Sequence, residues 1–158
     1  MKKTVLLTSE HNFKWQSMQE IMPFLVQSWL KSSSPEHLVL AFNVDHIPMV
    51  EYIREMADTD NLVLTCFTPQ IFKIAQFIRK KFNSKIRFLT HLHGQASVSC
   101  WPMRRWGGHN FFIKKDIFIS SCRRDADCFL LSYPEAKVAI MPFSYTEFPP
   151  IISNVSKS

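Results

Sequence analysis

Apolar residues are concentrated in six short runs along the chain, and longer amphipathic segments separate these runs. Most of the runs are almost continuously apolar, which is typical of strands that are covered on both faces of a parallel sheet. We therefore predict strands at residues 4–8, 37–43, 61–68, 85–91, 116–121 and 137–141.

The segments between the predicted strands carry apolar residues at the spacing of amphipathic helices. They cover residues 14–31, 44–56, 69–82 and 123–133, and Pro23 is expected to kink the first. Strands that alternate with helices form right-handed βαβ units. The pattern predicts an α/β, Rossmann-like, doubly wound fold, with a mainly parallel six-stranded sheet in the order 3-2-1-4-5-6 and helices on both faces.

The chain of 158 residues has the usual size of one domain. We assign residues 1–143 to this domain. Residues 144–158 contain prolines and end in Ser, Asn and Lys, a composition typical of a linker or a C-terminal tail.

The net charge of +6 favours an anionic partner, which could be nucleic acid, anionic lipid or a phosphorylated substrate. Arg79, Lys80 and Lys81 form a basic cluster at the end of a predicted helix. We expect this cluster to be a solvated helix end that compensates the helix dipole, with no binding role.

The four cysteines form no CxxC pair, so neither a zinc ribbon nor a disulfide scaffold is predicted. Free thiols in a reducing compartment are expected. Nothing in the chain resembles a signal peptide, and no apolar run reaches the length of a membrane span. The expected location is the cytoplasm.

Ligands of open α/β sheets bind at the carboxyl ends of the strands, so the residues after each strand are informative. The first strand is followed by Ser9, Glu10, His11 and Asn12 and not by a GxGxxG loop, which argues against the usual dinucleotide site. The sequence also lacks the GxxxxGK[ST] phosphate loop and the GxSxG nucleophile elbow. Three common enzyme classes are thereby disfavoured.

The fourth predicted strand ends in Thr-His-Leu-His-Gly, and the two-residue period places His91 and His93 on the same face. A metal site would need further His or carboxylate ligands, and the sequence shows no matching cluster beyond isolated His46 and His109, so we predict no metal. An imidazole at this position can hydrogen-bond a substrate hydroxyl or phosphate. The alternative is a hydrogen-bonded structural histidine, which is the preferred interpretation for His91.

Gly94 allows a turn after this strand, and Gln95 could open a helix whose amides face the crevice and bind an anion. Residues 101–106 read Trp-Pro-Met-Arg-Arg-Trp, with the paired guanidinium groups of Arg104 and Arg105. This segment could be a structural flap, a contact with a membrane surface or a platform for nucleic acid.

Two stretches, LTHLHGQASVS and KKDIFISSCRRDADCFLLSYPEAKVAIMPFS, resemble the N-terminal domain of glycosyltransferases with the two-Rossmann-domain GT-B fold, especially the retaining enzymes of family four. In that family the fourth strand commonly ends in a histidine-containing turn. The next strand gives a D-hydrophobic-S run, and a K-V-x-V-I-P strand leads to the interdomain linker. Residues 116–121 and 137–142 fit these last two elements.

The resemblance implies transfer of a sugar from a nucleotide-sugar donor to an acceptor hydroxyl, with neither metal nor cofactor. It implies that His93 lies near the reacting sugar and is the catalytic position, with His91 as second choice. The residues implied to face the cleft are His91, Ser9, His11, Asn12 and either Ser120 or Ser121. The turn and the basic segment add Gly94, Gln95, Arg104 and Arg105 as candidate substrate-binding residues.

The chain departs from the family in two places. The loop after the first strand has no glycine, and the E-x7-E signature of the donor-binding C-terminal domain is absent from the 158 residues. The resemblance therefore implies the acceptor-binding half of an enzyme of cell-surface glycan or glycolipid synthesis, inactive by itself. The implied partners are a sugar or lipid-linked acceptor, a nucleotide-sugar donor held by a C-terminal domain, a membrane surface and a second copy of the chain.

Two other functions remain open from the residues alone. The chain could be a standalone Rossmann-like module that binds nucleotide or nucleic acid without catalysis, through its basic surface and the rings of Trp101 and Trp106. It could also be a catalytically silent interaction domain, in which His93 is hydrogen-bonded within its own fold.

Overall fold

A computed structural model describes residues 1–9, 16–46, 51–65, 69–92 and 113–142 of the chain. Six strands form one sheet, in which every pair of neighbours is parallel. The strands are β1 (Lys2–Thr8), β2 (His37–Asn43), β3 (Asn61–Leu64), β4 (Arg87–Leu92), β5 (Ile117–Ser120) and β6 (Lys137–Ile140).

The α-helices of the described part are α1 (Gln16–Lys31), α2 (Glu51–Ala57), α3 (Pro69–Lys81) and α5 (Arg123–Ser132). The helix α1 continues through Pro23. Of the helix predicted at residues 44–56, Val44–His46 is a short 3-10 helix, η2, and Glu51–Ala57 is α2, while residues 47–50 lie outside the described residues.

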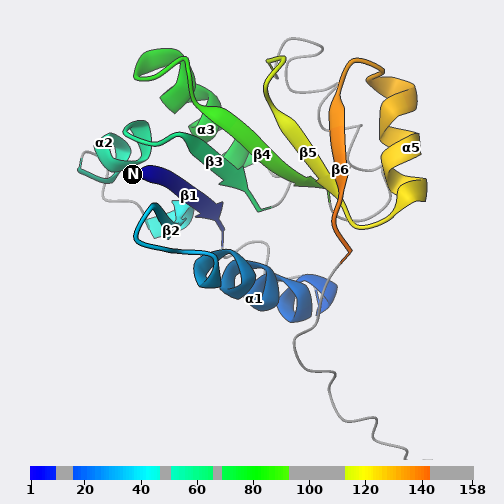
Figure 1. Cartoon of the computed structure of the whole chain (residues 1–158), viewed down its shortest axis with the longest axis horizontal. Helices are drawn as coiled ribbons and strands as arrows, with labels where there is room; N and C mark the ends of the chain where they lie inside the picture. Colours follow the sequence, from blue (N-terminus) through cyan, green and yellow to red (C-terminus); the bar gives the residue numbers. More distant parts are fainter. Residues whose placement is uncertain (10–15, 47–50, 66–68, 93–112, 143–158) are drawn as a thin grey trace, which may run out of the picture.

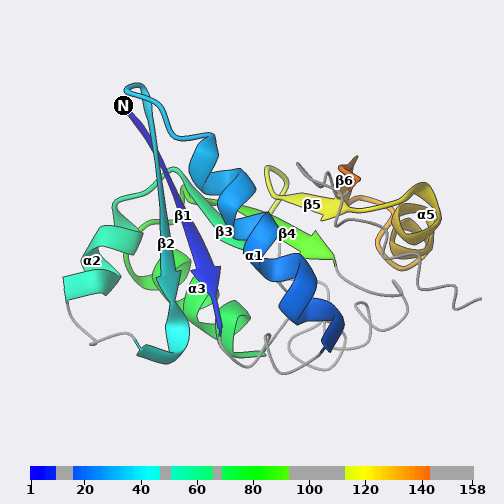
Figure 2. The same cartoon turned by 90° about the horizontal axis from the view of Figure 1, so that it is seen from below.

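The helices cover both faces of the sheet, as predicted (Figure 1). On one face α1 packs through partly buried Val26, Trp29 and Leu30 against a layer of strand residues, which are Leu6, Val39, Val63, Leu89 and Ile119. The other face packs against α2, α3 and α5 through a larger cluster that includes Val5, Leu7, Phe88, Phe118 and Phe129. Figure 2 shows α1 crossing the sheet on the side away from α2 and α3.

The strand order is 2-1-3-4-5-6, so the fold class is confirmed but the predicted order 3-2-1-4-5-6 is wrong. β3 pairs with β1 and not with β2, and Leu7 lies opposite Leu64. The physical reason is burial. All four residues of β3 are buried, which requires neighbours on both sides, whereas β2 has partly exposed positions that suit the edge of a sheet.

A row of polar side chains crosses four strands near their amino ends. Asn61 on β3 donates its Nδ2 proton to Thr4 Oγ1 on β1 at 3.1 Å, and its Oδ1 accepts from Arg87 Nε on β4 at 2.8 Å. Thr4 Oγ1 lies 2.7 Å from Nε2 of His37 on β2. Because these groups are partly or fully buried, each needs its partner, and the row favours the observed order of strands.

The end of α3 is held to the sheet by a buried ion pair. Arg79 Nη1 lies 2.8 Å from both carboxylate oxygens of Asp116, the residue before β5. Asp116 also accepts hydrogen bonds from the backbone N–H groups of Phe88 and Ile113, each at 2.9 Å. The Arg79 guanidinium stacks over the Phe88 ring, 3.6 Å from its centroid. The carboxylate is thus surrounded by donors.

The prediction that Arg79 belongs to a solvated helix end is therefore wrong, because its side chain is buried. Lys80 and Lys81 are exposed, as that prediction expects. All three stand in the last turn of α3. Their helical positions differ by about 100° each, and only Arg79 faces the sheet.

None of the helices in the described ranges is long and apolar enough to cross a membrane. Cys122 and Cys128 are free thiols, as predicted, while Cys66 and Cys100 lie outside those ranges.

Candidate functional site

All six strands are parallel, so their carboxyl ends meet at one edge of the sheet, which is the edge where doubly wound proteins bind ligands. The crevice forms where the strand order reverses. In the observed order the chain passes from β1 to β2 on one side and places β3 on the other. The candidate site therefore lies at the carboxyl ends of β1 and β3, and not between the first and fourth strands as the predicted order would have it.

Hydroxyl side chains tie these strand ends together. Thr65, directly after β3, donates its hydroxyl proton to the Leu7 carbonyl of β1 at 2.8 Å. Thr8, the last residue of β1, donates to the Phe42 carbonyl of β2 at 3.2 Å. Each threonine hydroxyl thus forms a hydrogen bond to a backbone carbonyl of the neighbouring strand. These hydrogen bonds join the carboxyl ends of β1, β2 and β3.

Ser9 and Asp45 link the first two strands at the same edge. Ser9 is 1% exposed, and its hydroxyl donates to Asp45 Oδ2 at 2.8 Å. The backbone N–H of Asp45 donates in turn to Asn43 Oδ1 at 2.9 Å, which fixes the turn after β2. Sequence reasoning placed Ser9 at this edge but missed Asp45. Asp45 could have been identified from the sequence, because it is a carboxylate two residues after the end of a predicted strand.

His91 is the next-to-last residue of β4 and is 5% exposed. Its Nε2 atom accepts a hydrogen bond from the indole Nε1–H of Trp29 on α1, at 3.1 Å. The two rings meet edge to face, with centroids 6.1 Å apart. An acceptor nitrogen carries no proton, so this contact selects the neutral imidazole with its proton on Nδ1.

We predict that Trp29→Phe lowers the free energy of unfolding by about 1–3 kcal/mol, because a buried imidazole nitrogen loses its donor. Urea denaturation measures the change, and the ¹⁵N shift of His91 Nε2 reports the lost hydrogen bond. Gln27→Ala, at an exposed position of the same helix, is the control. Equal stability of the two variants would show that the indole hydrogen bond contributes nothing.

Ser120 ends β5 and is fully buried. Its hydroxyl donates to the Cys122 carbonyl at 3.0 Å, and its carbonyl accepts the Met141 N–H at 2.8 Å. The residue therefore shapes the turn into α5 and joins the ends of β5 and β6.

The predicted site residues divide into two groups. Ser9, His91 and Ser120 lie near the same sheet edge, and each forms a hydrogen bond within the chain. The other predicted site residues lie outside the described residues, so their roles stay predictions. These are His11, Asn12, His93, Gly94, Gln95, Arg104 and Arg105.

In the part of the chain that the structure describes, no group of three or more His, Cys, Asp or Glu side chains is arranged so that it could hold a metal ion.

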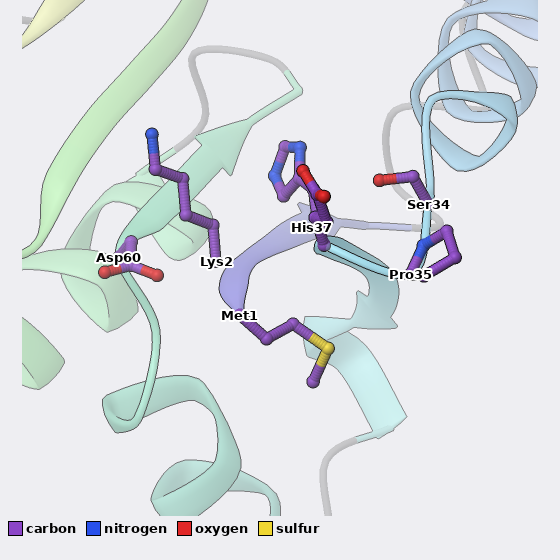
Figure 3. A pocket seen from close by; sticks show the side chains of 7 residues that line it. Met1, Lys2, Ser34, Pro35, His37 and Asp60 are labelled. Atoms are coloured by element: carbon purple, nitrogen blue, oxygen red, sulfur yellow. The ribbon is translucent and has the colours of Figure 1, made fainter.

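A pocket lies at the opposite edge of the sheet, beside the amino ends of β1 and β2 (Figure 3). Two of its polar side chains take part in the fold: His37 bonds Thr4, and Asp60 Oδ2 accepts the backbone N–H of Lys3 at 2.8 Å. Its position away from the carboxyl ends makes it a weaker candidate than the crevice. The lining residues are Met1, Lys2, Ser34, Pro35, Glu36, His37 and Asp60.

No family model, curated protein or solved structure matches this chain. Interpretation of the site therefore depends on its own residues and on the architecture that places them.

Proposed function

We propose that this chain is the acceptor-binding half of a glycosyltransferase that moves a sugar from a nucleotide-sugar donor to an acceptor hydroxyl. One observation carries the proposal. The two stretches of the glycosyltransferase resemblance include three strands, β4 in the first and β5 and β6 in the second, and β5 is the direct neighbour of both others. Leu92, Ser120 and Ile140, the last residues of these strands, stand in one continuous register, so all three strands end at one edge of the sheet.

The residues of this edge take separate roles in the proposal. His93, the residue after β4, orients the acceptor or the reacting sugar through a hydrogen bond. Ser9 and Ser120 act indirectly, because their hydroxyls are bound to Asp45 and to the Cys122 carbonyl. They position the loops that contact the acceptor.

The remaining substrate contacts come from the loops around this edge. His11 and Asn12 follow β1, and Gly94 and Gln95 follow His93. The paired guanidinium groups at residues 104–105 bind the phosphate of a phosphorylated or lipid-linked acceptor. The donor is held by a second domain, whose cationic groups and helix amides stabilise the leaving phosphate without a metal. The proposed location is the cytoplasm, at the membrane surface.

Backbone NMR of the ¹⁵N-labelled chain tests the proposal by titration with lactose, maltose and UDP. We expect the disaccharides to shift the amide signals of Leu92 and Ser120, which border the proposed acceptor site, and UDP to shift neither. The amide of Ser32, in the turn after α1, is the control and should not move. Absence of any saccharide response at the carboxyl ends of β4 and β5 would contradict the proposal.

A second candidate is a nucleotide-binding module without catalysis. It is favoured by the reversal of strand order between β1 and β3, which is where doubly wound domains bind nucleotides. In the same titration this module would respond to UDP at Thr8 and Thr65 and ignore the disaccharides.

A further inference from the structure

Charge is unevenly distributed along this chain. Residues 61–115 contain no Asp or Glu but more than half of the 19 Lys and Arg residues. Within the described ranges this stretch forms β3, α3, β4 and the turn before β5. The end of α3 and the beginnings of β4 and β5 lie along one edge of the molecule (Figure 1). This stretch is itself free of carboxylates, whereas α2, which packs beside α3, carries exposed Glu55 and is followed by exposed Asp58.

The outward side of α3 carries cations and aromatic rings. Lys73, Phe77, Lys80 and Lys81 are exposed at spacings of three and four residues, which places them on one helical face. The inward side of the helix is apolar and buried in the core. The outward residues therefore do not hold the helix to the sheet.

Two large rings on this face remain open to solvent. Phe77 is 47% exposed and Phe82 is 52% exposed. Their centroids lie 5.8 Å apart with the planes at 73°, so the rings pack edge to face against each other. These two rings in contact, with exposed lysines beside them, make the outward side of α3 a candidate interaction surface.

The basic character extends to the neighbouring turns. The Lys115 ammonium donates a hydrogen bond to the Lys85 carbonyl, so the turn before β5 lies against the turn before β4. Arg79 contributes little to this field, because Asp116 neutralises it inside the protein. We call Lys73, Phe77, Lys80, Lys81, Phe82 and Lys85 the α3 face.

We propose that the α3 face binds the surface of an anionic phospholipid bilayer. The lysine ammonium groups lie at the level of the lipid phosphates, and their apolar stems run along the bilayer surface. Phe77 and Phe82 enter the boundary between headgroups and acyl chains, where their exposed rings leave water. The helix lies in the plane of the membrane.

Lipid fits this surface better than nucleic acid does. Single-stranded nucleic acid stacks its bases on the faces of separate aromatic rings, whereas these two rings already pack against each other. A bilayer can take up both rings together between its headgroups, and its phosphates can pair with the flanking lysines. The proposal is independent of the glycosyltransferase function, so either can fail without the other.

Cosedimentation of the full chain with vesicles tests the proposal. We expect binding to vesicles of equimolar phosphatidylglycerol and phosphatidylcholine, none to phosphatidylcholine alone, and weaker binding as salt rises. Each lysine near such a surface contributes about fivefold to affinity. The double variant Lys80→Gln/Lys81→Gln should therefore bind about 25-fold more weakly. Phe77→Ser/Phe82→Ser should bind about tenfold more weakly, because two apolar rings are lost.

Matched variants on α5 separate the α3 face from bulk charge and bulk hydrophobicity. Arg123→Gln/Arg124→Gln removes two exposed cations, and Leu131→Ser removes a side chain that is 84% exposed. We expect each to bind anionic vesicles within about twofold of the unchanged chain.

Three results would overturn the proposal. The first is no binding of the unchanged chain to anionic vesicles. The second is an equal loss of binding in the α3 and α5 variants. The third is unchanged vesicle binding by the α3 variants. If the chain binds a single-stranded oligonucleotide through Lys80 and Lys81 and leaves vesicles unbound, the surface belongs to nucleic acid instead.

Discussion

Asp116→Ala should lower the free energy of unfolding by about 3–5 kcal/mol, the cost of leaving a buried charge without its partner. The carboxylate binds Arg79 and two backbone N–H groups, and its side chain is only 1% exposed. The change removes every one of these acceptors while the guanidinium stays beneath the surface. Chemical denaturation followed by far-ultraviolet circular dichroism measures the loss.

Two comparisons make this result specific to the buried pair. Asp127→Ala breaks the exposed pair with Arg123, in which the side chains are 57% and 81% exposed, and should leave stability almost unchanged. The double variant Arg79→Met/Asp116→Asn removes both charges and keeps one oxygen for the backbone donors. It should be more stable than Asp116→Ala. If Asp116→Ala is as harmless as Asp127→Ala, the ion pair does not hold α3 to β5.

If the chain is the acceptor-binding half of a glycosyltransferase, as we propose, His93→Ala in the two-domain protein should lower kcat/KM for glycosyl transfer by about 10²-fold, because the proposed orienting hydrogen bond would be lost. The expected denaturation midpoint equals that of the unchanged protein. His93→Gln, which retains a donor and an acceptor, should recover part of the rate. A steady-state assay with the nucleotide-sugar donor measures both variants.

His91, two residues earlier and within β4, provides the contrasting variant. Its imidazole accepts the Trp29 indole proton inside the fold, so His91→Ala should destabilise the protein by about 1–3 kcal/mol. The transfer rate of the folded fraction should change little. Unaltered transfer by His93→Ala, or a rate loss confined to His91→Ala, would exclude the proposed division of roles.

The regular elements were readable from the sequence because hydrophobic periodicity reports burial directly. The six strands and the helices α1, α3 and α5 overlap the predicted segments, although β3 ends at Leu64 and the prediction extended to residue 68. The segment at residues 44–56 was predicted as one α-helix, whereas its described parts are the 3-10 helix η2 and the α-helix α2. Periodicity alone does not show where a helix begins.

The candidate site was predicted in part. The carboxyl ends of the strands follow from the fold class, so Ser9, His91 and Ser120 were correctly placed near one edge. Their hydrogen-bond partners were not predictable. Asp45 and Trp29 are 36 and 62 residues away from the groups they bind, and nothing in the local sequence joins them.

The sequence by itself determined the strands, the helices covering both faces, the parallel α/β class and the basic stretch around α3. Each of these depends on residue type and local spacing. Only the tertiary structure decided that β3 lies beside β1, which moved the crevice, and that Arg79 points inward while Lys80 and Lys81 remain in solvent. The physical reason is that strand order and buried pairing depend on which distant groups can satisfy one another, and short-range patterns carry no such information.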